Sequence, residues 1–174
     1  TPLNDWVVKN REKITGAGIH ILCVTGPGKT APTAPETDGT DASPRVRFIP
    51  FCDKMPEALS AADVVVSRSG AGSIAEFITC SVPSVLVPYP FAADNHQEAN
   101  ARFLESLGGG AVVPQTQIET LTGEVLRLLG DDAALAQLRE NLRLARARFA
   151  WQPMVEDIIQ LADARGPAKV KNEK

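Results

Sequence analysis

The chain has 174 residues, a formal net charge of −3 and a hydrophobic content of 44%, which suits one globular domain with a substantial core. The small charge and the 5% aromatic content argue against a nucleic-acid-binding protein, because no basic stripe with interleaved aromatic residues is present. We therefore expect no nucleic-acid partner.

The first part of the chain alternates helix and strand patterns. A helix is predicted over 3–14 and an apolar strand over 19–24. Residues 25–44 are rich in Gly, Pro, Thr and Asp without any period, which predicts a long mobile loop. A second strand is predicted over 46–50. A short helix follows over 55–62, with Pro56 tolerated in its first turn.

The middle of the chain continues this alternation. The apolar run at 64–67 does not alternate, which predicts a strand buried on both faces. A helix over 73–80 follows a glycine turn, and a strand over 84–87 is ended by Pro88 and Pro90. A helix over 95–107 ends at the glycines of 108–110, and a fifth strand covers 111–113.

The last third is predicted to be helical, over 119–129, 133–149 and 154–164. Residues 165–174 are charged and have no apolar anchor, so we expect a disordered tail there. These patterns predict one domain over 1–164, followed by the tail at 165–174.

Alternating strands and helices predict an α/β fold with a parallel, doubly wound sheet. Ligands of such sheets bind beyond the carboxyl ends of the strands. Three segments are expected at that edge: 51–53, 67–73 and 91–97. Their convergence supports a binding site more strongly than any single motif.

Cysteine and histidine usage is sparse. Cys23, Cys52 and Cys80 form no C-x-x-C pair, which argues against a disulfide framework or a zinc site and favours a reducing compartment. The two histidines are far apart, and Asp131-Asp132 has the pattern of a helix start. We expect no metal, no cofactor, no signal peptide and no membrane span.

The glycine turn is the most informative motif. Gly70, Ala71 and Gly72 open a helix whose free N–H groups can face phosphates, with Ser73 also on phosphate. The carboxylate of Glu76 can accept two hydrogen bonds from a ribose diol. Ser73 and Glu76 also have the spacing of a capping box, in which both side chains would bond the helix start instead. The spacing leaves both interpretations open.

The other candidates carry similar alternatives. Phe51 is either a core residue or a ring that stacks on a base, with the Cys52 backbone beside it. Arg68 either contacts phosphate or forms an ion pair with a carboxylate, and we favour the ion pair. Asp94 and Asn95 are good N-cap residues.

His96 and Gln97 follow in the first turn of that helix, where neutral donors and acceptors suit a sugar, and Asn100 can support them. Catalysis by His96 is not favoured, because the spacing suggests no nucleophile or carboxylate partner.

Four ordered segments resemble the MurG family, the bacterial UDP-N-acetylglucosamine transferases that complete lipid II. They are Phe51–Met55, Ala61–Glu76, Pro83–Pro88 and Asp94–Ala101, within a likeness that runs from about Leu3 to Ala162. The resemblance implies a GT-B enzyme of two Rossmann-like domains. This chain corresponds to the C-terminal, donor-binding domain.

The resemblance also implies roles for single residues. Uracil would lie at Phe51 and the Cys52 backbone, the diphosphate at 71–73, the ribose at Glu76, and N-acetylglucosamine at His96 and Gln97. The whole implied donor-binding set is Phe51, Cys52, Met55, Ser69, Gly70, Ala71, Gly72, Ser73, Glu76, His96 and Gln97. No catalytic residue is expected in this chain.

Two departures from the family pattern matter. The family's donor domain opens with a strand and a Gly-Gly-Ser-x-Gly-Ala loop, and this sequence matches the family only after that loop. We therefore expect this first strand, which is a central strand of the sheet, to be missing. The N-terminal domain, which binds the lipid acceptor and supplies the general base, is also not represented. We therefore expect this chain alone to be inactive, to bind UDP-sugar weakly and to be poorly stable at its exposed sheet edges.

The implied activity of the whole protein is that of an inverting hexosyltransferase, which transfers N-acetylglucosamine from UDP-N-acetylglucosamine to lipid I. It would act in peptidoglycan and cell wall synthesis, with effects on cell shape and division, in the cytoplasm and peripherally on the inner face of the plasma membrane.

Three alternatives remain. The first is a different UDP-sugar transferase of the same fold. The sequences at 68–70 and 94–97 disfavour the branch of these enzymes that acts on natural products. A UDP-N-acetylglucosamine 2-epimerase should bring further His and acidic residues to the cleft. The third alternative is a non-catalytic nucleotide-sugar-binding subunit of a split transferase.

Overall fold

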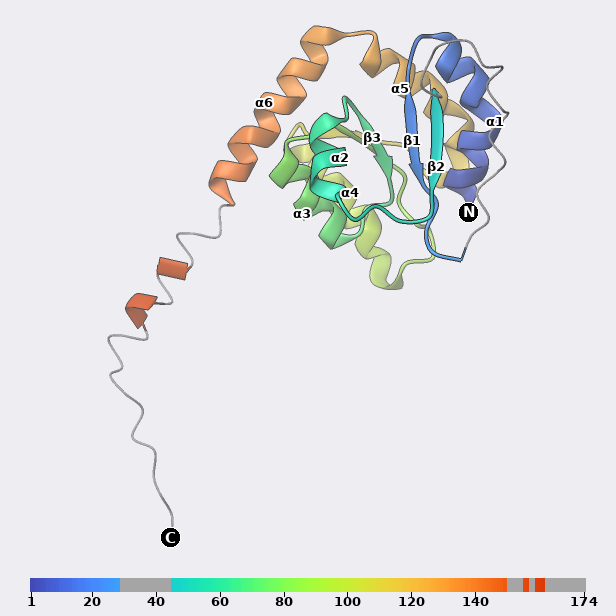
Figure 1. Cartoon of the computed structure of the whole chain (residues 1–174). Helices are drawn as coiled ribbons and strands as arrows, with labels where there is room; N and C mark the ends of the chain where they lie inside the picture. Colours follow the sequence, from blue (N-terminus) through green and yellow to red (C-terminus); the bar gives the residue numbers. More distant parts are fainter. Residues whose placement is uncertain (29–44, 150–154, 157–158, 162–174) are drawn as a thin grey trace.

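The computed structural model describes residues 1–28, 45–149, 155–156 and 159–161. The elements in chain order are α1 (Pro2–Gly16), β1 (Ile21–Val24), β2 (Val46–Ile49), α2 (Met55–Ala61), β3 (Val65–Ser67), α3 (Ala71–Cys80), β4 (Ser84–Leu86), the 3-10 helix η1 (Ala93–Asn95), α4 (His96–Ser106), β5 (Gly110–Val112), the 3-10 helix η2 (Gln115–Thr120), α5 (Leu121–Leu129) and α6 (Asp132–Arg148) (Figure 1). The predicted tail at 165–174, most of the predicted loop at 25–44 and most of the predicted helix at 154–164 lie outside the described residues.

The strands are all parallel, which confirms the α/β class. β1 pairs with β2, and β3, β4 and β5 form a second sheet in that order. β1 and β3 share no ladder among the described strands, so the parallel sheet is interrupted between them. The strands therefore form two parallel sheets, and β1 and β3 each have one unpaired edge.

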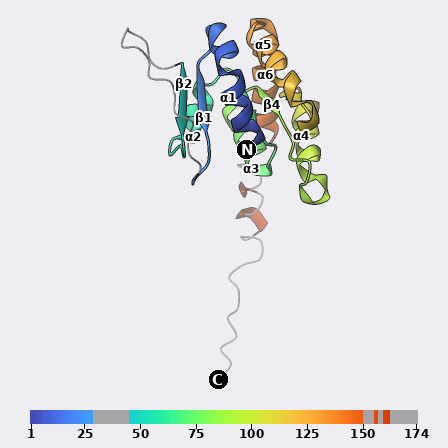
Figure 2. The same cartoon turned by 90° about the vertical axis from the view of Figure 1, so that its right-hand side faces the viewer.

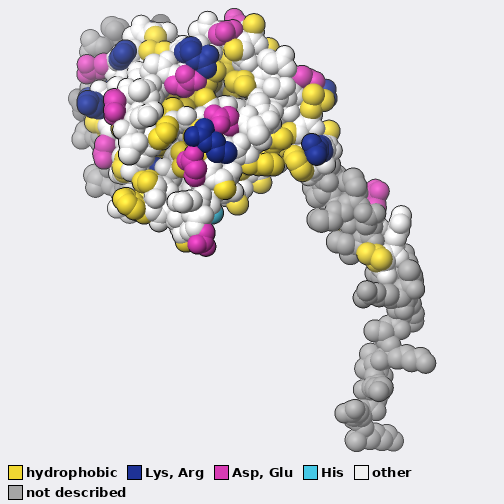
Figure 3. Space-filling model, turned by 180° about the vertical axis from the view of Figure 1, so that it is seen from behind, with side chains coloured by type: hydrophobic (Ala, Val, Ile, Leu, Met, Phe, Trp, Pro, Cys, Tyr) yellow, Lys and Arg dark blue, Asp and Glu magenta, His cyan; other side chains and the backbone are white. Residues whose placement is uncertain are grey.

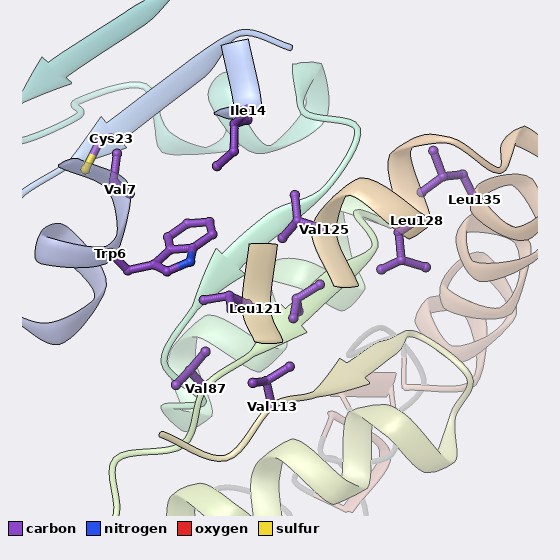
Figure 4. Packing of buried hydrophobic residues seen from close by; sticks show 11 residues of the cluster. Trp6, Val7, Ile14, Cys23, Val87, Val113, Leu121, Val125, Leu128 and Leu135 are labelled. Carbon is purple, nitrogen blue, oxygen red and sulfur yellow. The ribbon is translucent and has the colours of Figure 1, made fainter. Parts of the chain in front are cut away.

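Helices cover both faces of the sheet around β4. On one face, Val85 and Val87 pack with residues of α1 and α5, among them Trp6, Leu121 and Leu128 (Figure 4). On the other face, Leu86 belongs to a cluster with residues of α3, α4 and α6, including Ile74, Leu104 and Leu142. This arrangement on two faces confirms the Rossmann-like layering that the sequence predicts.

The most buried strand is β4, not β3. Every residue of β4 is buried, whereas Val65, Val66 and Ser67 are half-buried. β4 has a paired neighbour on each side, but β3 pairs on one side only. The 64–67 strand is predicted to be buried on both faces, and its side chains do reach both clusters, but they are only half-buried.

Helix α1 is held at two points, by α5 and by the carboxyl end of β1. The Trp6 indole N–H donates to the Thr122 hydroxyl of α5 over 3.0 Å, and both residues are buried. Figure 2 shows α1 beside α5 on this side of the molecule. The start of α1 is tied to the carboxyl end of β1, because the Asn4 amide donates to the Thr25 carbonyl oxygen over 3.2 Å.

Several surface charges lie next to charges of the opposite sign. Arg102 contacts Glu98 and Glu105 on α4, and Arg143 contacts Glu140 on α6. Figure 3 shows basic and acidic side chains lying next to each other on the rear face. Such pairs are exposed and contribute little to stability, about 0–1 kcal/mol each.

Candidate functional site

Two of the three predicted segments meet at the carboxyl edge of the three-stranded sheet. The buried Ser69 hydroxyl, just after β3, donates to the Gln97 carbonyl oxygen over 2.7 Å. The Asn100 amide of α4 donates to the Ser69 carbonyl oxygen over 2.9 Å. Two hydrogen bonds therefore hold the turn after β3 to the start of α4. Ser69 makes one with its side chain and the other with its backbone.

The helix after the turn begins earlier than predicted. Gly70 is the N-cap of α3, in an extended conformation, and makes no side-chain cap bond. Ser73 is the third residue of the helix and Glu76 lies in its second turn. The capping-box alternative is therefore wrong, because Ser73 does not occupy the cap position. No described side chain caps the first N–H groups of this helix, which is the arrangement that binds anions.

The space at the start of α3 is open. Ala71, Gly72 and Glu76 are exposed, and a Cβ added at Gly72 would meet no described atom within 4 Å. Packing in the described part of the chain therefore does not require a glycine at 72. A glycine there leaves room for a ligand to approach the backbone.

Phe51 is 66% exposed, so the core alternative for this residue is wrong. It follows β2 in the two-stranded sheet, and Cys52 beside it is half-buried. Met55, at the start of α2, is partly buried against the cluster that contains Leu86. An exposed ring beside a strand end is suited to stacking on a flat base.

Arg68 does not form the expected ion pair with any carboxylate among the described residues. One guanidinium nitrogen donates to the carbonyl oxygens of Val87 and Pro88, over 3.0 Å each, and another donates to the Gln115 side-chain oxygen. The guanidinium also lies 5.5 Å from the centre of the Tyr89 ring. Burial lowers the pKa of Arg68 from its usual value, and the nearby Tyr89 opposes this effect.

The segment before α4 is bent through a left-handed conformation. Asp94 has φ 50° and Asn95 has φ 53°, left-handed values that Asn and Asp adopt more often than other non-glycine residues. Asn95 is the N-cap of α4, but neither side chain makes a cap bond, so the expected side-chain capping is wrong. Strained backbone of this kind is frequent at functional sites.

This bend exposes His96 and half-buries Gln97. His96 Nδ1 lies 2.7 Å from the Ala93 carbonyl oxygen. Since a carbonyl only accepts, Nδ1 carries the proton and the other ring nitrogen is left for a ligand. The Gln97 side-chain oxygen accepts from the Tyr89 backbone N–H over 3.0 Å, which leaves its NH₂ group without a partner among the described residues.

Two residues at this edge that the sequence analysis did not identify, Tyr89 and Gln115, both contact Arg68. Tyr89 lies between Pro88 and Pro90 after β4, and Gln115 opens the segment after β5. Both positions follow strand ends at the carboxyl edge, which is the signal that could have identified them.

Other observations bear on ligands. Among residues 1–28, 45–149, 155–156 and 159–161, no group of three or more His, Cys, Asp or Glu side chains could hold a metal ion. No helix in that part of the chain is long and apolar enough to cross a bilayer. A surface hollow of about 400 Å³ lies beside β5, and one of about 760 Å³ lies where the ends of α2 and α3 face α6. Neither includes a predicted site residue.

The family described as the glycosyltransferase family 28 C-terminal domain matches residues 1–152. This chain belongs to that family. A similar protein is the UDP-N-acetylglucosamine–N-acetylmuramyl-(pentapeptide) pyrophosphoryl-undecaprenol N-acetylglucosamine transferase of Opitutus terrae, which is 42% identical to this chain over 167 residues. The alignment covers 95% of this chain and 44% of that protein. The protein of the same name from Sorangium cellulosum is 36% identical over 169 residues, covering 93% of this chain and 41% of that protein. The domain therefore spans less than half the length of these relatives.

Solved structures agree with this assignment. The family 28 domain aligns with Acinetobacter baumannii MurG at a TM-score of 0.52 and 33% identity, over 57% of this chain and 29% of that one. It aligns with the glycosyltransferase of kitacinnamycin at a TM-score of 0.59 and 26% identity, over 79% of this chain and 35% of that one. The fold is therefore that of the GT-B glycosyltransferases, as the sequence predicts.

Proposed function

We propose that this chain is the donor-binding domain of a glycosyltransferase that moves N-acetylglucosamine from UDP-N-acetylglucosamine to lipid I, forming lipid II. The observation that carries the proposal is the uncapped, exposed start of α3, with Glu76 one turn further along and His96 and Gln97 beside it. The sugar and its acceptor are those in the name of the relatives, which are 42% and 36% identical to this chain.

Each part of the donor has a candidate partner. The diphosphate would lie against the N–H groups of residues 70–73, where the helix dipole favours negative charge. The exposed Glu76 carboxylate would accept from the ribose hydroxyls. His96 and the free NH₂ of Gln97 would bind the sugar, and Phe51, the Cys52 backbone and Met55 would hold the uracil.

The chemical contribution of this domain is electrostatic. In an inverting transfer the acceptor hydroxyl attacks the anomeric carbon while UDP departs with an added negative charge. The N–H groups at the start of α3 are fixed before the reaction and would stabilise that charge as it develops. The acceptor and the general base would come from outside this chain, so the chain alone would not catalyse transfer.

The arrangement of β1 and α1 supports a larger domain in the whole protein. α1 begins beside the carboxyl end of β1, as the bond from Asn4 to Thr25 shows. A strand leading into α1 would thus run parallel to β1 and could pair with the unpaired edges of β1 and β3. We propose this strand as part of a donor domain that includes residues 1–164. A separate acceptor-binding domain would work at the inner face of the plasma membrane.

Binding measurements test the proposal directly. Isothermal titration of the chain with UDP-N-acetylglucosamine, UDP-glucose and UDP should give the highest affinity for UDP-N-acetylglucosamine, since His96 and Gln97 add contacts that UDP lacks. Equal affinity for the three ligands would remove the case for sugar recognition. No binding of any uridine nucleotide would reject the proposal as a whole.

A further inference from the structure

Arg68 joins three segments that the chain brings to the carboxyl edge. It lies after β3, its guanidinium donates to the last carbonyls of the β4 exit at Val87 and Pro88, and it reaches Gln115 after β5. The fork of N–H groups in a guanidinium can serve such separate acceptors at once, which a lysine ammonium does less well.

The β4 exit in turn holds Gln97. The residue after Pro88 is Tyr89, whose ring lies 5.5 Å from the Arg68 guanidinium and whose N–H donates to the Gln97 side-chain oxygen. This bond uses the acceptor end of the Gln97 amide, and the NH₂ end has no hydrogen-bond partner among the described residues. A hydrogen-bonded chain thus runs from Arg68 through the β4 exit to Gln97.

We propose that Arg68 is a positioning residue that orients the Gln97 amide as a donor toward the sugar of the nucleotide-sugar. The inference rests on the proposed function. It differs from both earlier interpretations of Arg68, since the guanidinium contacts neither a described carboxylate nor, on this proposal, the phosphate. Its hydrogen bonds are already used on the protein backbone and on Gln115.

The proposal predicts a selective loss. Without Arg68 the β4 exit loses two carbonyl contacts and the Tyr89 contact, so the Tyr89 N–H no longer fixes Gln97. The affinity for UDP-N-acetylglucosamine should then fall by about three- to tenfold, the range of one lost hydrogen bond. The affinity for UDP should stay within about twofold, because UDP does not reach Gln97.

A double-mutant cycle tests this in the 174-residue chain, with Arg68→Met, Gln97→Ala and the combined variant titrated with both ligands. Arg102→Met is the matched control, because this exposed arginine contacts only Glu98 and Glu105 on α4 among the described side chains. Arg68→Lys, which keeps the charge, guards against loss of folding in Arg68→Met and should show a smaller selective loss. Thermal melting of each variant reports its stability.

The proposal is supported if Arg68→Met has no further effect on sugar binding once Gln97 is Ala, and if the Gln97 side-chain NH₂ signals in NMR spectra shift in Arg68→Met without ligand. Additive losses, or equal losses for UDP and UDP-N-acetylglucosamine, would overturn it and point to a phosphate contact or a general structural role. If the unmodified chain binds neither ligand, the proposed function itself fails, and this inference fails with it.

Discussion

Glu76 carries a charge that the described part of the protein does not use. Its side chain is exposed, lies in the second turn of α3 and has no hydrogen-bond partner among the described residues. A group of this kind adds nothing to helix capping here, since Gly70 holds the cap position. Its contribution is therefore expected in ligand binding and not in stability.

Glu76→Gln should lower the affinity for UDP by about tenfold or more, because hydrogen bonds to a charged acceptor are worth roughly 1.5–3 kcal/mol. The melting temperature should hardly change, since surface substitutions usually stay within about 0.5 kcal/mol. Titration and thermal melting measure the two effects. Glu12→Gln, another exposed glutamate, on α1, is the control and should change neither.

Single residues were the hardest part to predict from the sequence. The spacing of Ser73 and Glu76 fits a capping box, but the spacing cannot tell where the helix begins, and α3 begins at Ala71. For Arg68, nearby carboxylates in the sequence suggested an ion pair. Its acceptors are backbone carbonyls of the β4 exit, which a sequence does not display.

At the scale of elements, α1 and α5 are joined across the fold by one buried hydrogen bond. The Trp6 indole N–H and the Thr122 hydroxyl are 116 positions apart in the chain and 3.0 Å apart in space. Both belong to helices that cover the same face of β4 (Figure 4). This bond ties α1 to α5, and its loss would be costly because it would leave an indole N–H without a partner in the core.

Thr122→Val keeps the shape of the side chain but removes the acceptor, so the Trp6 N–H is left buried without a partner. The free energy of unfolding should fall by about 1–3 kcal/mol. Urea unfolding followed by circular dichroism measures this loss. Thr79→Val, at an exposed position in α3, is the matched control. A similar loss in the control would assign the effect to helix propensity instead.

The bounds of most described helices and strands agree with prediction to within about two residues, since apolar runs end at prolines and glycines such as Pro88 and Gly108. The pairing of strands was less accessible. The apolar runs at 19–24 and 64–67 do not show which strands pair with which, and the structure shows that β1 and β3 share no ladder. The pairing depends on contacts between distant segments, which local patterns do not encode.

At the scale of the whole molecule, side chains of both parallel sheets pack in one cluster with side chains of α1 and α5. Side chains of β1 and β4, Cys23 and Val85 among them, belong to the same cluster although their strands lie in different sheets. The three-stranded sheet has a central strand with partners on both sides, whereas β1 and β2 have only each other among the described strands. The two sheets should therefore differ in local stability.

Hydrogen exchange followed by mass spectrometry tests this difference. Peptides covering 84–87 should exchange more slowly than peptides covering 21–24, because β4 is buried and paired on both edges. Equal protection of both peptides would show that the described domain opens only as one cooperative unit.

The contact between Trp6 and Thr122 also gives the molecule an intrinsic optical reporter. The chain has two tryptophans, and the second, Trp151, lies outside the described residues. In a Trp151→Phe variant, the emission wavelength of Trp6 would register water reaching its indole ring. A red shift of the Trp6 emission would therefore report when α1 separates from α5, without any added dye.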